Sequence, residues 1–267
     1  MRRASPASAD RIAADPVVPP TPLPIPADDL AARLVAGAAA LGLDLSAAQQ
    51  TRLLGYLGLL SRWGRVYNLT AVREPAQMLT QHVLDSLAVW PALRRRLEMT
   101  PSRAPAHAAA APAAIGACAS AAPARRLLDV GSGAGLPGVV LAIVAPDLEV
   151  SCVDAVGKKA GFVRQVAAEL GLHNLRAEHA RVESLPAGRE AGGFDVVTSR
   201  AFASLADFVD ASQAQLAPAG VWMAMKGQVP DLEIAALPAQ VEVFHVEQLA
   251  VPGLQAQRCL VWMRRRG

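Results

Sequence analysis

Four closely spaced glycines are the residues of this sequence that most directly suggest chemistry. They lie between two apolar runs in the stretch RRLLDVGSGAGLPGVVLAIV, residues 125–144, at Gly131, Gly133, Gly135 and Gly138. Because glycine weakens the interior of a helix or strand, such a cluster indicates main chain that turns tightly or passes close to something. A nucleotide, a phosphate or a tight turn alone would each account for it, so the neighbouring residues have to decide.

Two aspartates frame the glycines. Asp129 precedes them, and Asp154 ends the next apolar run along the chain. An acidic residue at the position of Asp154 can accept hydrogen bonds from ribose hydroxyls, which predicts a cofactor that contains adenosine. Asp129 either holds the loop through main-chain N–H groups or takes an indirect part in ligand binding, and the sequence leaves both open. A dinucleotide fingerprint requires glycine where Leu136 stands, which counts against a nicotinamide cofactor.

The histidines and cysteines form no recognisable catalytic or metal-ligand pattern. We interpret the histidines as surface or packing residues and predict no metal site. The cysteines are odd in number, far apart and without a CxxC pair, which is typical of a reducing cytoplasm. These residues are His82, His107, His173, His179 and His245, with Cys118, Cys152 and Cys259.

The composition permits several partners without selecting one. The chain has 267 residues, of which 52% are hydrophobic, and a net charge of +3, which allows a nucleic-acid partner but does not argue for one. No apolar run has the length and purity of a membrane helix, so we predict no membrane partner. Only three of the 26 basic residues are lysines, Lys158, Lys159 and Lys226. Because arginine is used almost everywhere else, these three lysines suggest places where a compact ammonium group is needed.

Composition divides the chain into a proline-rich arm, a helical lobe, an Ala/Pro linker and a larger domain, at residues 1–26, 27–98, 99–125 and 126–267. The arm is expected to be extended and disordered. In the lobe, apolar residues recur at helical spacing, Ser46 is a candidate helix cap, and Pro91 is expected to end or kink the last helix.

After residue 126, short apolar runs alternate with helical patterns. Such alternation predicts a doubly wound α/β sheet that is largely parallel, with ligands at the carboxyl ends of its strands. The last two strands have no helix between them, so we expect an antiparallel hairpin at one edge of the sheet. The expected strands are 126–130, 148–155, 174–180, 194–201, 220–227, 240–248 and 257–265, and the later helices fall at about 203–216 and 228–236.

Six segments in a fixed order narrow the function. They are YNLTAVREPAQMLTQHVLDSLAV, LLDVGSGAGLPGVVLAIVAP, VDAVGKKAGFVRQVAAELGL, HARVESL, FDVVTSRAFASLADFV and MKG. Together they closely resemble the RsmG (GidB) family of bacterial small-subunit ribosomal RNA methyltransferases, over residues 45–98 and 126–265. The resemblance implies a class I S-adenosylmethionine-dependent fold, which is a Rossmann-like, seven-stranded, mostly parallel sheet with an N-terminal helical lobe. It also implies methylation of guanine N7 at nucleotide 527 in the decoding-site loop of 16S rRNA.

The resemblance also assigns residues to a cofactor site and a substrate site. Gly131, Gly133, Gly135 and Leu136 would line the cofactor, Asp154 would face its ribose, and Val182 and Glu183 would lie beside its adenine. Arg200 would lie at the edge of the cofactor near the substrate, where it could hold a carboxylate or an RNA phosphate. Lys226 could orient the guanine or its phosphate, although an ordinary surface lysine and an ordinary ion pair at Arg200 remain open.

The reaction that the resemblance implies explains why no catalytic base stands out. Guanine N7 is an unprotonated lone pair at neutral pH, so its attack on a sulfonium methyl group needs alignment and electrostatics rather than a base. RNA binding would then rest on basic residues such as Lys158–Lys159 and Arg264–Arg266. Asn68, Thr70 and Arg73 could touch RNA as well, but we favour a role in docking the lobe.

Three departures from the family pattern accompany the resemblance: the arm, the Ala/Pro segment 99–124, and a loosened loop at 186–193. Other functions remain to be weighed. A class I methyltransferase acting on another RNA or a small molecule is the main alternative, although SRAF stands where exocyclic-amine RNA methyltransferases carry [N/D]-P-P-[Y/F]. A nicotinamide-dependent oxidoreductase and a noncatalytic ribosome-assembly factor are further ones. The expected partner is 16S rRNA in the small ribosomal subunit, and the expected state is a cytoplasmic monomer.

Overall fold

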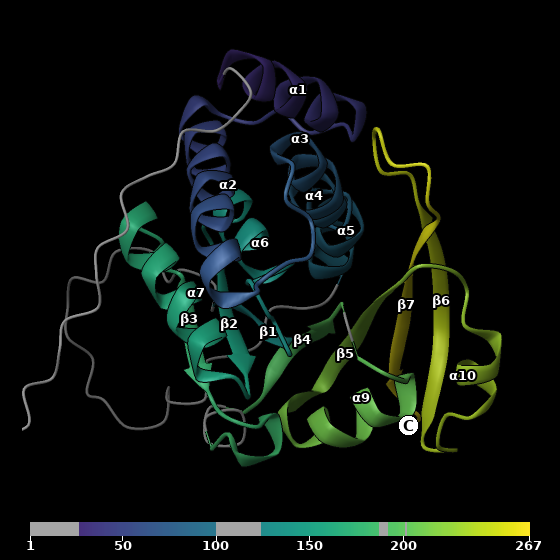
Figure 1. Ribbon diagram of the computed structural model, residues 1–267. Helices are drawn as coiled ribbons and strands as arrows, with labels where there is room; N and C mark the ends of the chain where they lie inside the picture. The colour runs from purple at the N-terminus through teal and green to yellow at the C-terminus, as the bar shows by residue number, and fades with distance from the viewer. Residues whose placement is uncertain (1–26, 100–123, 187–191, 201) are drawn as a thin grey trace, which may run out of the picture.

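The computed structural model describes residues 27–99, 124–186, 192–200 and 202–267, and Figure 1 shows their arrangement. The expected arm at 1–26 and most of the expected linker lie outside these residues. Among the described helices, none is long and apolar enough to cross a membrane.

The chain before residue 100 is helical. Ser46 opens the longest helix with a capping box, in which its hydroxyl accepts from the Gln49 N–H and the Gln49 amide oxygen accepts from the Ser46 N–H. The predicted interruption at Pro91 is confirmed, because one helix ends at Leu87 and the next begins at Trp90. A π-helical segment in this region was not predicted. The elements are α1 (Ala27–Ala40), α2 (Ala47–Tyr67), α3 (Pro75–Met78), η1 (the π-helix Leu79–Leu84), α4 (Asp85–Leu87) and α5 (Trp90–Met99).

The rest of the chain alternates strands and helices, as predicted. The strands are β1 (Arg125–Val130), β2 (Leu148–Asp154), β3 (Leu175–His179), β4 (Phe194–Ser199), β5 (Leu216–Lys226), β6 (Val241–Leu249) and β7 (Arg258–Arg265). The helical elements between them are α6 (Gly138–Val144), α7 (Gly157–Leu170), η2 (Val182–Ser184), α9 (Leu205–Ser212), η3 (Gln213–Gln215) and α10 (Asp231–Ala235).

The seven strands form one sheet in the order β3-β2-β1-β4-β5-β7-β6. The first five run parallel, and β7 pairs antiparallel with both β5 and β6, so the expected edge hairpin is confirmed. This is the Rossmann-like, seven-stranded and mostly parallel sheet that the family resemblance implies. The order reverses between β1 and β4, and in such sheets the ligand lies at the carboxyl ends of the strands on either side of that reversal.

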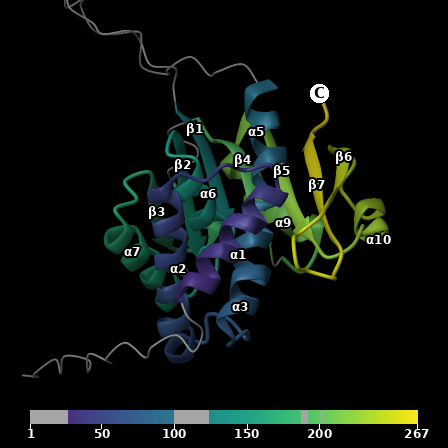
Figure 2. The ribbon, with the colours of Figure 1, turned by 90° about the horizontal axis from the view of Figure 1, so that it is seen from above.

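Each face of the sheet has its own apolar core. Side chains of alternate strand residues point to opposite faces. Leu127, Val150 and Met223 join the core beneath the N-terminal helices, α6 and α7, whereas Leu128 and Trp222 join the core beneath α9. Figure 2 shows α1, α2 and α6 stacked over one side of the sheet. The helices before residue 100 are therefore packed directly on the sheet that carries the glycines.

Most strand boundaries differ from the predicted ones by one or two residues, and the start of β5 differs by four. β5 begins at Leu216 rather than at residue 220, because Pro218 and Gly220 continue the strand through an irregularity in the β4–β5 pairing. A Cβ atom at Gly220 would lie 2.7 Å from the carbonyl oxygen of Phe194. Gly220 therefore permits close approach of two strands.

Candidate functional site

Three of the four glycines lie in the loop between β1 and α6, at the carboxyl end of the central strand, and Gly138 is the first residue of α6. Gly131, Gly133 and Gly135 all have positive φ angles, of 64°, 59° and 88°. No described atom lies within 4 Å of the place where a Cβ atom at Gly131 would stand. A side chain there would project into open space beside the loop, so the loop leaves room for a ligand close to its backbone.

Asp154, at the end of β2, holds this loop in place. Its Oδ2 accepts from the Gly133 N–H at 2.9 Å, and its Oδ1 accepts from the Val156 N–H at 2.8 Å. A carboxylate has about four lone-pair positions, so each oxygen can accept a further bond from a ribose hydroxyl. Asp154 can therefore cap the end of β2 and still accept a hydrogen bond from a ribose.

Asp129 lies fully buried beneath the loop. Its Oδ2 accepts from the Gly138 N–H at 2.9 Å, whereas its Oδ1 has no hydrogen-bond partner among the described residues. Burial raises the pKa of Asp129 to about 7, against lowering by the Gly138 N–H and by Arg200. An acceptor without a partner beneath a loop with open space above it fits a site for a cofactor that carries a cationic group.

Tyr56 joins the helical lobe to the glycine loop. This residue of α2 is fully buried, and its hydroxyl donates to the carbonyl oxygen of Ala134 at 2.9 Å. Burial raises the pKa of the Tyr56 hydroxyl well above its usual range, so it remains a donor. Nothing in the glycine motif itself identifies this contact, because the partners are far apart in the sequence.

Arg200 follows β4 and reaches the π-helix of the lobe. Its guanidinium lies 3.4 Å from Oδ2 of Asp85 and donates to the carbonyl oxygen of Gln81 at 3.3 Å. Arg258, at the start of β7, donates to the other oxygen of Asp85 at 2.9 Å. Asp85 is buried, so one carboxylate from the lobe positions two arginines from the sheet. The Asp85 pairing makes Arg200 an ion-paired residue, and Arg258 is a site candidate that sequence reasoning missed.

His82 lies one helical turn before Asp85. Its Nε2 is 2.7 Å from the hydroxyl of Thr70, and its Nδ1 is buried without a partner in the described part of the chain. Burial and the nearby Arg200 lower the pKa of His82 to about 4, so the ring is neutral at pH 7. Arg73 donates to the carbonyl oxygen of Gly64. Both contacts lie within the lobe, so a role of Thr70 and Arg73 in docking the lobe on the sheet stays a prediction.

Lys226, the last residue of β5, is an ion-paired lysine. Its ammonium group lies 2.8 Å and 3.1 Å from the two carboxylate oxygens of Glu233, and its side chain is largely buried. Glu233 also accepts from the Leu205 N–H at 2.7 Å. The ion pair with Glu233 therefore holds the lysine at the carboxyl end of the sheet.

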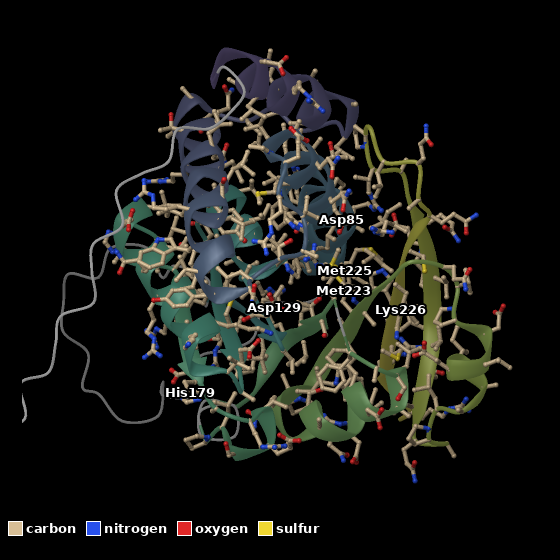
Figure 3. The ribbon with its side chains drawn as sticks, in the orientation of Figure 1. Asp85, Asp129, His179, Met223, Met225 and Lys226 are labelled. Atoms are coloured by element: carbon tan, nitrogen blue, oxygen red, sulfur yellow. The ribbon has the colours of Figure 1, made fainter. Side chains whose placement is uncertain are left out.

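Arg200 and Lys226 line the same recess, of about 370 Å³, which we call the Arg200 recess. Asp85 and Met225 also line it, and Figure 3 labels Asp85 among the lobe helices and Met225 and Lys226 at the sheet below. The recess lies between the π-helix and the ends of β4, β5 and β7. The structure thus brings the two predicted catalytic residues together with Asp85 and Arg258.

The other predicted residues are placed differently. The side chain of Leu136 is buried in the core beneath the helices, which leaves its main chain to face a ligand. Val182, in η2, is buried in the core on the other face of the sheet, and Glu183 is exposed beside it. Lys158 lies in the first turn of α7, with its ammonium 5.9 Å from the Tyr67 ring centroid. Arg264 lies at the far end of β7, paired with Glu242.

Comparison with known proteins agrees with this geometry. The model of the family described as "rRNA small subunit methyltransferase G" matches residues 49–99 and 114–261. "Ribosomal RNA small subunit methyltransferase G" of Methylibium petroleiphilum is 59% identical over 247 residues, covering 92% of this chain and all of that protein. The protein of the same name from Acidovorax sp. strain JS42 is 59% identical over 228 residues, covering 85% of this chain and 92% of that one.

Among solved structures, TrmN from Thermus thermophilus superposes on 54% of this chain and 45% of its own, with 23% identity and a TM-score of 0.43. The family model spans well over half of the chain, and the sequence relatives match along most of their length. The chain therefore belongs to the rRNA small subunit methyltransferase G family.

Proposed function

We propose that this protein transfers a methyl group from S-adenosylmethionine to N7 of guanine 527, in the decoding-site loop of 16S rRNA. The names of its relatives support a small-subunit ribosomal RNA substrate. We further propose that it acts as a cytoplasmic monomer on the small ribosomal subunit. The observation that carries the proposal is the placement of the glycine loop, Asp154 and the Arg200 recess at one edge of the sheet.

The cofactor site is proposed at the glycine loop. S-adenosylmethionine, when bound, supplies an electrophilic methyl group on a sulfonium centre. The main chain of Gly131 and Gly133 would lie against it, and Asp154 would accept from its ribose hydroxyls while it holds the loop. Val182 and Glu183, on η2 just beyond β3, are proposed to flank the adenine.

The guanine is proposed to enter the Arg200 recess. Its O6 is an acceptor adjacent to N7, and an arginine or lysine N–H suits that acceptor. Arg200 and Arg258 are held at the recess by Asp85, and Lys226 by Glu233. A donor on O6 fixes the base and disfavours adenine, whose amino group at that place is itself a donor.

No proton has to be removed from the attacking nitrogen. The buried ring of His82 is neutral at pH 7, so it carries no acidic proton into the reaction. Reaching N7 requires an unpaired nucleotide, because the deep major groove of A-form RNA shields it. The chemistry therefore rests on alignment of the base and on the fixed charges around it.

The test uses labelled S-adenosylmethionine with assembled small subunits and with naked rRNA, both from cells that lack the modification. We expect label in N7-methylguanine at one decoding-loop position, mapped by chemical cleavage. Arg200→Ala should abolish transfer while the thermal midpoint stays close to wild type. Arg176→Ala, at an exposed site on β3, is the matched control and should transfer normally. Label elsewhere, or normal transfer by Arg200→Ala, would overturn the assignment.

A further inference from the structure

A second hollow adjoins the Arg200 recess. It has a volume of about 890 Å³ and lies between residues 226–233 and residues 256–258, and we call it the α10 hollow. Lys226, Gly227 and Arg258 line both spaces. The two hollows therefore share one wall, and a ligand in one can continue into the other.

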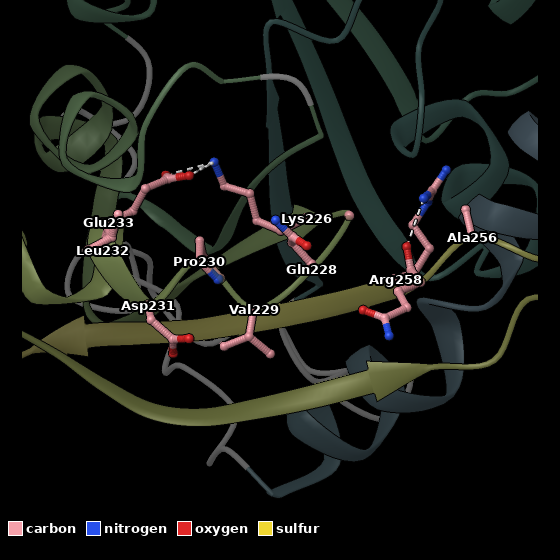
Figure 4. A pocket seen from close by; sticks show the side chains of 11 residues that line it. Lys226, Gln228, Val229, Pro230, Asp231, Leu232, Glu233, Ala256 and Arg258 are labelled. Atoms are coloured by element: carbon pink, nitrogen blue, oxygen red, sulfur yellow. Dashed lines mark hydrogen bonds and ion pairs between the residues drawn. The ribbon is translucent and has the colours of Figure 1, made fainter.

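The centre of the shared wall is a glycine, so no side chain projects from it. Gly227 is exposed, and no described atom lies within 4 Å of the place where its Cβ atom would stand. Lys226 and Arg258 flank it, each tied to a carboxylate, Glu233 for the lysine and Asp85 for the arginine. Figure 4 shows the Lys226–Glu233 pair on one side of the α10 hollow and Arg258 on the other. A polymer backbone can cross here without displacing a side chain.

The lining of the α10 hollow combines apolar groups with uncharged amides. Leu232, on α10, is 88% exposed, which is high for a large apolar residue. Val229 and Pro230 lie beside it, and Gln228 and Gln257 add exposed side chains that can both donate and accept. Apolar faces with amide groups at their edges suit a flat ligand that has polar edges.

The charges of the α10 hollow are balanced. Lys226 and Arg258 are matched by Asp231 and Glu233, and the lysine and Glu233 pair directly at 2.8 Å. A phosphate would find little excess positive charge in this hollow, whereas a neutral nucleobase would lose little by leaving water for it. The lining thus favours a base over the backbone that carries it.

We propose that the α10 hollow binds the base of the unpaired nucleotide next to the target guanine. This inference rests on the proposed function and adds a second base site to it. The target guanine occupies the Arg200 recess, its neighbour packs its face on Val229 and Leu232, and the intervening sugar-phosphate crosses at Gly227. The two bases are thereby separated by a wall, which keeps the guanine unstacked with its N7 accessible.

The test compares Leu232→Glu with Val35→Glu in the full chain. Val35 is also an exposed apolar helix residue, 44% exposed on α1, so it controls for the added charge. For each protein we would measure the Kd for a labelled single-stranded decoding-loop RNA, the KM for small subunits, the Kd for S-adenosylmethionine and the thermal midpoint. Photo-crosslinking would use RNA with a reactive base beside the target guanine.

We expect Leu232→Glu to weaken RNA binding by about tenfold or more, because the base would lose its apolar contact with the leucine side chain. Val35→Glu should bind RNA like wild type, and both should keep cofactor affinity and melting behaviour. The reactive base should crosslink to residues 228–232. Unchanged RNA affinity in Leu232→Glu, with crosslinks elsewhere, would overturn the α10 site while wild-type methylation still upheld the proposed function.

Two other outcomes separate the proposals. Crosslinks at 228–232 without methylation of guanine N7 would retain the base site and overturn the proposed reaction. A loss seen with assembled subunits but not with naked RNA would place a ribosomal protein, rather than a base, on Leu232, and would overturn the base site.

Discussion

The hydroxyl of Tyr56 donates to the carbonyl oxygen of Ala134 at 2.9 Å, so a helix of the lobe is bonded directly to the middle of the glycine loop. Both residues are buried, so the bond depends on how the lobe packs against the loop. The lobe is thus part of the loop's support as well as a cover for one face of the sheet.

Replacing that tyrosine tests the link. Tyr56→Phe leaves the buried Ala134 carbonyl without its donor, so we expect a loss of about 1–2 kcal/mol in the free energy of unfolding, measured in urea. The Kd for S-adenosylmethionine should rise, because the loop is less firmly held. Tyr67→Phe, on the same helix at a half-buried ring, is the control and should change neither quantity appreciably. Equal effects of the two substitutions would contradict a specific role for the Tyr56 bond.

Two glycines of the loop should respond differently to alanine. Both Gly131 and Gly135 have positive φ, which costs an alanine about 1–2 kcal/mol. A Cβ atom at Gly135 would also overlap Cγ2 of Val139, and overpacking adds about 1–3 kcal/mol. We therefore expect Gly135→Ala to be clearly the less stable variant in urea unfolding.

Cofactor affinity should change in the opposite order, so that Gly131→Ala loses more of it than Gly135→Ala. The new methyl group of Gly131→Ala would stand in open space beside the loop, where the cofactor is proposed to lie. We expect the Kd of Gly131→Ala for S-adenosylmethionine, measured by calorimetry, to rise by about tenfold or more. Wild-type affinity in Gly131→Ala would move the proposed cofactor away from this glycine.

The buried carboxylate of Asp85 should matter more for RNA methylation than for cofactor binding. Asp85→Asn keeps the shape but removes the charge that holds Arg200 and Arg258, and we expect a loss of about 2 kcal/mol in stability. The kcat/KM for rRNA should fall by about tenfold or more, with the cofactor Kd nearly unchanged. Asp29→Asn, at an exposed pair with Arg33 on α1, is the control. A parallel loss of cofactor affinity would show that Asp85 acts on the loop instead.

Two buried groups should give the stability opposite dependences on pH. The pKa of His82 is lowered to about 4, so protonation in the unfolded chain reduces stability as pH falls from about 6.5 to about 4. The pKa of Asp129 is raised to about 7, so ionisation in the unfolded chain reduces stability as pH rises from about 4 to about 7. Each effect is about 3–4 kcal/mol, and in the wild type they largely cancel.

Single substitutions should expose each dependence. His82→Gln, which keeps a polar group near Thr70, should become less stable as pH rises between about 4 and 7. Asp129→Asn should become more stable over the same interval. Urea unfolding of both variants across that interval measures the two slopes, and slopes of the same sign would contradict the opposed titrations.

Local patterns in the sequence predicted much of the fold. The Ser46 capping box, the alternation of strands and helices, and the adjacent final strands each depend on residues close together in the chain. The glycine loop and Asp154 could be foreseen for the same reason, since a strand, a turn and the next strand place them at one edge. The family resemblance rested on such short segments.

The sequence by itself determined which elements form and which edge of the sheet carries the glycines, because helical and strand periodicity are local properties. Only the tertiary structure decided the polar network around the proposed reaction site. The Asp85 carboxylate meets Arg200 and Arg258 across separations of 115 and 173 residues, and Tyr56 meets Ala134 across 78. Such contacts depend on how the lobe packs on the sheet, and no local pattern encodes that packing.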